Sequence, residues 1–133
     1  MKKLGECVDK VVLFSGRFDP FHLGHLLTIL KLGKIYKKII VVILDHFESK
    51  YPISYRKEAI IQSLSYYNID YEVIVNKIHF AKITKNELSK YKFDIYAAGN
   101  LEVLKHIESL GYETVYVERS FEYSGTEIRK NNN

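Results

Sequence analysis

Two histidines separated by a leucine and a glycine are the residues of this chain best suited to chemistry. His22 and His25 follow the segment Ser-Gly-Arg-Phe-Asp-Pro-Phe at 15–21, with an apolar run before that segment and a helical pattern after the pair. The histidines therefore lie where a strand ends and a helix begins. The free N–H groups and the positive dipole end of a helix N-terminus attract anions. Two imidazole donors added there predict a phosphate-binding site.

A second polar cluster lies near the other end of the chain. Arg119 precedes it, and residues 123–129 read Tyr-Ser-Gly-Thr-Glu-Ile-Arg. The chain has 16 lysines and only 4 arginines, so the positions of the arginines are informative. Arg17 and Arg129 fall inside the two clusters, where a planar guanidinium suits a phosphate held at two oxygens. Arg56, near a predicted helix start, is equally consistent with an ordinary surface arginine.

Length and composition narrow the class of protein. We expect one domain over residues 1–133, because this length can bury its own core. The net charge of +4 suits anionic substrates, but no basic stripe indicates nucleic acid. The apolar runs are too short to span a membrane, and the single cysteine excludes an internal disulfide. No signal peptide is recognisable, so a cytoplasmic location is expected.

Short apolar runs alternate with helical patterns along the chain. The predicted strands are Val11–Phe14, Lys38–Leu44, Asp70–Val75, Phe93–Ala98 and Thr114–Val117. The predicted helices are Leu23–Leu32, one from Ser54 to about Tyr67, a short one near Glu87–Lys90, Leu101–Leu110, and a last one opened by Ser124. This alternation predicts a parallel sheet covered by helices on both faces, in an α/β, Rossmann-like fold of about five strands.

Several residues predict where helices begin and end. Gly33 is expected to end the first helix and Gly111, as a C-cap, the fourth. Ser54 and Thr84 are expected to cap the N-termini of the second and third helices.

Ligands of such sheets bind beyond the carboxyl ends of the strands. The loops expected at that edge are Ser15–His22, Asp45–Pro52, Asn76–Ile83, Gly99–Asn100 and Glu118–Ser124. Both polar clusters therefore fall on one edge of the sheet. A glycine-rich dinucleotide motif and a P-loop are both absent from the sequence.

Other interpretations of the histidine pair remain open. Zinc needs a third ligand, and the other histidines, His46, His79 and His106, lie on other predicted elements. We therefore predict no protein-bound metal site. The pair could also serve only to cap a helix.

The two clusters together resemble a known superfamily. Residues 16–25 read Gly-Arg-Phe-Asp-Pro-Phe-His-Leu-Gly-His, which resembles the signature of the nucleotidyltransferases with the His-x-Gly-His motif. Residues 124–129, Ser-Gly-Thr-Glu-Ile-Arg, resemble their second motif. The resemblance implies transfer of a nucleoside monophosphate from a nucleoside triphosphate to a small phosphate-bearing acceptor, with release of pyrophosphate. It also points to a homodimer.

The branch of the superfamily is less sharply marked. Arg17, the Pro-Phe-His run and the second motif look most like archaeal-type nicotinamide mononucleotide adenylyltransferases, which favours ATP. The chain length looks more like the cytidylyltransferases that use CTP and glycerol phosphate or a related polyol phosphate. A nucleotide-binding sensor without turnover is a third interpretation, against which the intact histidine pair argues.

The resemblance implies a role for each matching residue. His22, His25, Lys50 and Arg129 would act on the reacting phosphates, and Mg²⁺ would bridge the triphosphate mostly through water and phosphate oxygens. The predicted nucleotide-binding residues are Gly16, Arg17, Phe18, Gly24, Gly99, Asn100, Arg119, Ser124, Gly125 and Thr126. Asp19 could assist in binding Mg²⁺ or cap the turn before Pro20. Phe47, Tyr51 and Tyr55 could line the acceptor pocket.

Overall fold

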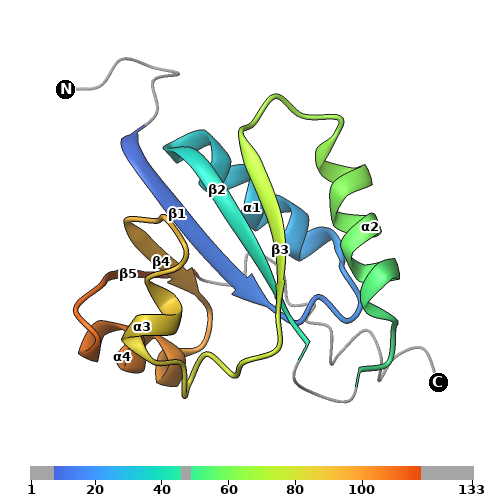
Figure 1. Ribbon diagram of the computed structural model, residues 1–133. Coiled ribbons are helices and arrows are strands. Elements are labelled where there is room, and N and C mark those ends of the chain that lie inside the picture. Colours follow the sequence, from blue (N-terminus) through green and yellow to red (C-terminus); the bar gives the residue numbers. More distant parts are fainter. Residues whose placement is uncertain (1–7, 46–48, 118–133) are drawn as a thin grey trace.

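Five parallel strands form one sheet in the order β3-β2-β1-β4-β5 (Figure 1). The computed structural model describes residues 8–45 and 49–117. The strands are β1 (Val8–Gly16), β2 (Tyr36–Leu44), β3 (Tyr71–Asn76), β4 (Ile95–Ala98) and β5 (Glu113–Tyr116). Every pair of neighbouring strands is parallel, so the predicted α/β, Rossmann-like fold class is confirmed.

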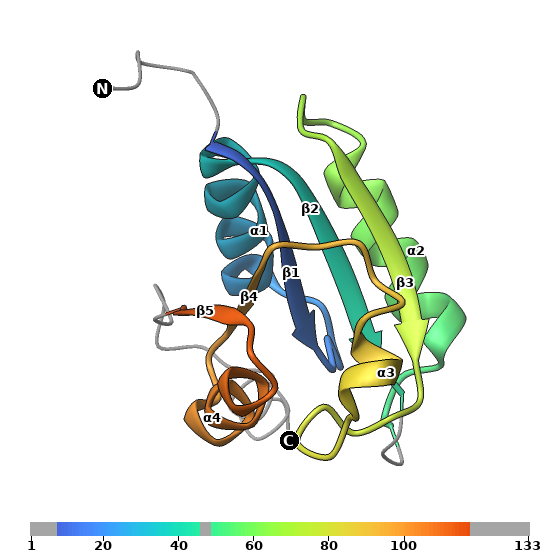
Figure 2. The same cartoon turned by 60° about the vertical axis from the view of Figure 1, so that its left-hand side comes forward.

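Helices cover both faces of the sheet. They are α1 (Leu23–Ile35), α2 (Ile53–Leu64), α3 (Lys85–Leu88) and α4 (Leu101–Ser109). Figures 1 and 2 show α1 and α2 on one face and α3 and α4 on the other. Within the described ranges, none of these helices has the length and apolar character needed to cross a bilayer.

The two faces carry separate apolar cores. Phe14, Ile39 and Val41 pack with α1 and α2, whereas the alternate residues Leu13 and Ile40 pack with α3 and α4. Central strands buried on both faces must be apolar almost without interruption, which is why β2 reads as a continuous hydrophobic run.

The direction of the connections reverses between β1 and β4, two neighbouring strands at the centre of the sheet. The chain leaves β1 toward α1 on one face and leaves β4 toward α4 on the other. In open α/β sheets, ligands bind beyond the carboxyl ends of the strands at such a switch point. The loop that follows β1 is the one that carries His22, and Gly99–Asn100 follows β4.

One predicted helix end is wrong for a reason of packing. Helix α1 does not stop at Gly33 but continues to Ile35. A Cβ atom at Gly33 would lie 3.0–3.2 Å from three side-chain atoms of Ile69. The glycine therefore allows α1 to approach the segment before β3 closely, and it does not terminate the helix.

The boundaries of α2 also differ from the prediction. Pro52, not Ser54, is the N-cap, and no side-chain hydrogen bond caps this helix. The helix ends at Leu64, before the predicted end at Tyr67. The other two predicted caps are confirmed: Thr84 accepts the N–H of Glu87, and Gly111 has a φ of +98°.

The contact at Gly33 predicts a coupled effect on stability. In the native background, we expect Gly33→Ala to lower the free energy of unfolding, because crowding Ile69 costs about 1–3 kcal/mol, more than the gain of about 1 kcal/mol in helix propensity. In an Ile69→Ala background the same change should be stabilising. Urea unfolding of the four proteins measures this coupling, and equal effects in both backgrounds would contradict it.

Candidate active site

The two histidines of the first cluster cap helix α1 reciprocally. His22 is the N-cap residue, and its Nδ1 accepts the backbone N–H of His25 at 3.4 Å. Nδ1 of His25 in turn accepts the backbone N–H of His22 at 3.2 Å. The interpretation as a helix cap is thus correct for one nitrogen of each ring.

The cap determines what the other ring nitrogens can do. A neutral imidazole carries one N–H, and a nitrogen that accepts a hydrogen bond cannot hold that proton. Because both Nδ1 atoms accept, the proton of each ring lies on Nε2. The reciprocal cap therefore directs the N–H of each neutral ring to Nε2, at the start of a helix that has no acidic residue in its first turn. The Nε2 atom of His22 is buried. Capping and anion binding are compatible.

Aromatic rings hold this pair in place. The rings of His22 and His25 stack with centroids 3.6 Å apart, and the ring of Phe21 stacks with that of His25 at 5.8 Å. The buried ring of Phe18 meets His25 edge-on at 4.9 Å. A Cβ at Gly16 would lie 3.1 Å from that Phe18 ring. Gly16 and Phe18 thus help to shape the loop, and contact with a nucleotide stays a prediction for both.

Asp19 joins the loop after β1 to the segment before α2. Its carboxylate is 2% exposed and accepts the backbone N–H groups of Lys50 and Tyr51, both at 2.8 Å. Arg17 lies 3.5 Å from the same carboxylate. The described contacts of Asp19 therefore connect the loop after β1 to the segment before α2. The sequence did not predict this role.

Arg56 differs from the surface arginine that the sequence left open. Its side chain is 1% exposed, so it is not a surface arginine. It donates to the carbonyl oxygens of Tyr51 and Arg17, both at 3.0 Å, and forms an ion pair with Asp45. The scarcity of arginine in a lysine-rich chain was the only signal that pointed to it.

The carboxyl end of β4 lies next to that of β1, at the same edge of the sheet. Asn100 is the N-cap of α4, and its side-chain oxygen accepts the N–H groups of Glu102 and Val103. A Cβ at the exposed Gly99 would lie 3.2 Å from the carbonyl oxygen of Val117. Asn100 therefore has a structural role, and its predicted contact with the nucleotide is not tested by these bonds.

A hydrogen bond between two buried hydroxyl groups links β1 to β4. The Tyr96 hydroxyl is hydrogen-bonded to Ser15, the penultimate residue of β1. Burial raises the pKa of the Tyr96 hydroxyl, which therefore remains protonated at physiological pH. The hydrogen bond satisfies two buried polar side chains and joins the end of β1 to β4.

The structure brings together only part of the predicted site. Gly24 lies in the first turn of α1, next to the histidines, and the exposed Lys50 is joined to the loop after β1 through its backbone. Six predicted positions lie outside the described residues: Phe47, Arg119, Ser124, Gly125, Thr126 and Arg129.

No protein-built metal centre is found among the residues that the structure describes. These residues contain no group of three or more His, Cys, Asp or Glu side chains able to hold an ion. Both carboxylate oxygens of Asp19 accept backbone N–H groups.

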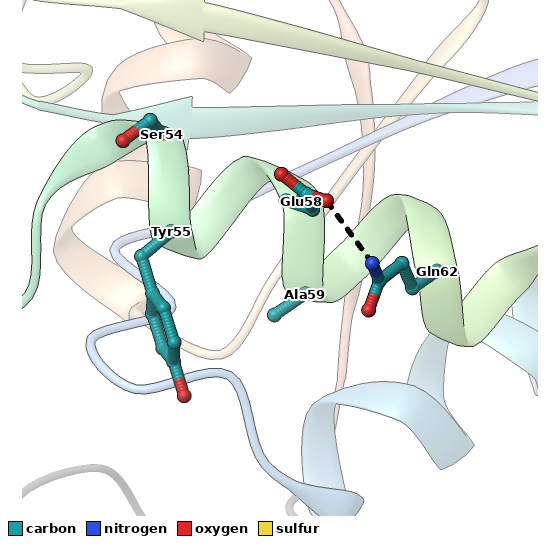
Figure 3. A pocket seen from close by; sticks show the side chains of 5 residues that line it. All are labelled: Ser54, Tyr55, Glu58, Ala59 and Gln62. Atoms are coloured by element: carbon teal, nitrogen blue, oxygen red, sulfur yellow. Dashed lines mark hydrogen bonds between the residues drawn. The ribbon is translucent and has the colours of Figure 1, made fainter.

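A surface hollow lies beside α2, with a volume of about 470 Å³. It is lined by Ser54, Tyr55, Glu58, Ala59 and Gln62 (Figure 3). Glu58 accepts a hydrogen bond from Gln62, and the exposed Tyr55 ring stacks on Tyr51 at 5.5 Å. Among the described residues, its lining contains a carboxylate and no cationic side chain, a composition that does not suit a phosphate.

Comparison with known proteins identifies relatives over most of the chain. A family described as cytidylyltransferase-like matches residues 13–131. A nicotinamide-nucleotide adenylyltransferase of Methanococcus aeolicus is 35% identical over 128 residues, which cover 89% of this chain and 74% of the relative. Nicotinamide-nucleotide adenylyltransferase 1 of Sulfolobus acidocaldarius is 32% identical over 131 residues, covering 89% of this chain and 75% of the relative.

A solved structure supports the fold independently. A bifunctional NMN adenylyltransferase/ADP ribose pyrophosphatase of Francisella tularensis, in complex with AMP and a manganese ion, superposes with a TM-score of 0.71 at 20% identity. The match covers 93% of this chain but only 41% of that protein. At this identity the likeness concerns the fold alone.

These relatives agree with the motif and the strand order. The matched region contains His22, Gly24 and His25, and the loop that carries them follows β1, one of the two strands between which the connections diverge. The chain is a nucleotidyltransferase and belongs to the cytidylyltransferase-like family.

Proposed function

We propose that this enzyme transfers AMP from ATP to nicotinamide mononucleotide and releases pyrophosphate. The observation that carries the proposal is the reciprocal Nδ1 cap of His22 and His25, which directs the ring N–H groups to Nε2 at a helix N-terminus beyond the carboxyl end of β1. Relatives named nicotinamide-nucleotide adenylyltransferase support the choice of ATP and of this acceptor over CTP and a polyol phosphate. We take residues 1–133 as one nucleotidyltransferase domain.

The reaction needs no covalent intermediate with the protein. A phosphate oxygen of the acceptor attacks the α-phosphorus of ATP in line, and a new P–O bond forms. The bond from the α-phosphorus to the oxygen that bridges it to the β-phosphate breaks, and pyrophosphate leaves on the opposite side. Positioning of the two substrates and stabilisation of negative charge therefore carry the catalysis.

The first cluster would act on the α-phosphate. The Nε2–H groups of His22 and His25 donate to its non-bridging oxygens as charge redistributes in the transition state. The N–H groups of the first turn of α1, at Leu23 and Gly24, add to this positive field. Neutral imidazoles serve this purpose well, because a proton on Nδ1 would break the reciprocal cap.

Other positive groups would hold the rest of the triphosphate. Arg17 extends from the loop after β1, and Lys50 would neutralise charge on the reacting phosphates. By resemblance to the second motif, Ser124, Gly125, Thr126 and Arg129 would hold the β- and γ-phosphates with Arg119 nearby. Mg²⁺ would bridge the triphosphate, mostly through water and phosphate oxygens.

The base of ATP would lie at the end of β4. Gly99 and Asn100 follow that strand directly, and Asn100 uses its side-chain oxygen to cap α4. The peptide groups of this turn would therefore recognise the base or ribose. Tyr51 and Tyr55, stacked on each other, remain candidates for the acceptor side.

A paired substrate assay tests the proposal. We expect pyrophosphate release and dinucleotide formation with ATP, Mg²⁺ and nicotinamide mononucleotide, and none above background with CTP and glycerol phosphate. Phosphopantetheine with ATP is a useful third arm, because a 28% identical relative is named phosphopantetheine adenylyltransferase. Turnover only with CTP would overturn the adenylyl assignment, and turnover only with phosphopantetheine would overturn the acceptor.

Two substitutions at His25 separate capping from phosphate binding. The two variants differ in the ring atom whose hydrogen bond they preserve. His25→Asn keeps an acceptor near the position of Nδ1, whereas His25→Gln keeps an N–H donor near the position of Nε2. We expect His25→Asn to retain the melting temperature but to lose about 10²–10³-fold in kcat. His25→Gln should lose more stability, about 1 kcal/mol, and less activity.

His106→Asn is the matched control for these variants. Nε2 of His106 lies 2.7 Å from the carbonyl oxygen of Ile83, on the face of the sheet covered by α3 and α4. Its substitution should leave kcat unchanged. If His25→Asn keeps native turnover while remaining folded, the Nε2–H of His25 is not part of the reaction.

The second motif gives a further prediction at Arg129. We expect Arg129→Lys to raise KM for ATP about tenfold, because a single ammonium cannot bind two phosphate oxygens in a fixed plane. KM for nicotinamide mononucleotide should change much less. Initial-rate measurements with each substrate varied in turn decide the matter, and an unchanged KM for ATP would remove Arg129 from triphosphate binding.

A further inference from the structure

The exposed Lys50 lies in an irregular segment that needs support from elsewhere in the fold. Its backbone N–H and that of Tyr51 both donate to the carboxylate of Asp19 at 2.8 Å. A single carboxylate that accepts two successive N–H groups fixes the orientation of the peptide between them. The position of Lys50 is therefore set by a residue three places before His22.

Arg56 binds a carbonyl oxygen of the same segment. Its Nε donates to the carbonyl oxygen of Tyr51, and its Nη1 donates to the carbonyl oxygen of Arg17. Its Nη2 pairs with Asp45, the residue that follows β2. Tyr51 is thus held at its N–H by Asp19 and at its carbonyl by Arg56.

The burial of these charged groups is informative. Arg56 is 1% and Asp19 2% exposed, and both are fully engaged with backbone groups and opposite charges. Buried ion pairs are often no more stabilising than apolar residues of the same volume. Their strict geometry does, however, fix the separation of the elements that they join. Here those elements are the loop before His22 and the segment that carries Lys50.

We propose that Asp19 and Arg56 are positioning residues, which hold the segment of Lys50 and Tyr51 against the loop after β1 so that Lys50 meets the reacting phosphates. The inference rests on the proposed function for the role of Lys50. The clamp itself, defined as the contacts of Asp19 and Arg56 with these two segments, rests on geometry alone. The two parts can therefore be tested separately.

Hydrogen exchange tests the clamp without any need for activity. Asp19→Asn replaces one acceptor oxygen with an NH₂ group, so one of the two N–H groups loses its partner. We expect exchange at the backbone N–H of Lys50 or Tyr51 to become at least about tenfold faster. Asp94→Asn is the matched control, because Asp94 accepts the backbone N–H of Val11 at 2.8 Å near the start of β1. It should leave those two positions unchanged.

A kinetic cycle tests whether the clamp acts through Lys50. With native Lys50, Asp19→Asn should lower kcat at least about tenfold, whereas in a Lys50→Met background it should lower kcat less than about threefold. A purely structural role would give equal losses in both backgrounds. Equal losses, or unchanged exchange at Lys50 and Tyr51, would overturn the proposal.

Arg56→Lys provides a second variant. Lysine keeps the charge but reaches at most one or two of the three acceptors. Exchange at the Tyr51 N–H should therefore become faster, and kcat should fall more with native Lys50 than in the Lys50→Met background. If Asp19→Asn fails to fold, this variant carries both comparisons. A native enzyme that makes no product from ATP and nicotinamide mononucleotide would refute the proposed function, while the exchange measurements would still decide on the clamp.

Discussion

The reciprocal hydrogen bonds between His22 and His25 are the constraint on which the site depends. They use the two Nδ1 atoms to satisfy N–H groups at the start of α1, and so each neutral ring must keep its proton on Nε2. The capping box usually uses Ser or Thr with Glu or Gln. Histidine performs the same task with Nδ1 alone. The cap thus fixes the tautomer of each neutral ring, with its N–H on Nε2.

The sheet places this pair beyond the carboxyl end of β1. Strands β1 and β2 are apolar and buried on both faces over their central residues, so their polar side chains lie near the strand ends. The order β3-β2-β1-β4-β5 makes β1 and β4 the pair at which the connections diverge, which is where ligands of such sheets bind. The hydrogen bond between Ser15 and Tyr96 joins those two strands.

Local sequence signals were sufficient for most of the fold. Continuous apolar runs predicted the five strands, and their alternation with helical patterns predicted a parallel sheet. The caps at Thr84 and Gly111 were also predicted, because each depends on its own residue type and on near neighbours. Gly33 was misread because its reason lies at Ile69, which is distant in sequence. The prediction at Ser54 was wrong because the sequence does not distinguish a serine in the first turn of a helix from a serine at the N-cap just before it.

The same distinction explains what could be foreseen of the site. The histidine pair is visible in the sequence because its parts are three residues apart, and helix geometry alone brings them together. Asp19 and Lys50 are 31 residues apart, and Arg56 and Arg17 are 39 apart, so only the fold reveals these contacts. Composition showed that arginine is rare in this chain but not which backbone oxygens it would bind. Since a buried guanidinium must satisfy its donors or lose stability, Arg56 joins the loop after β1 to the segment before α2, although it lies outside both motifs.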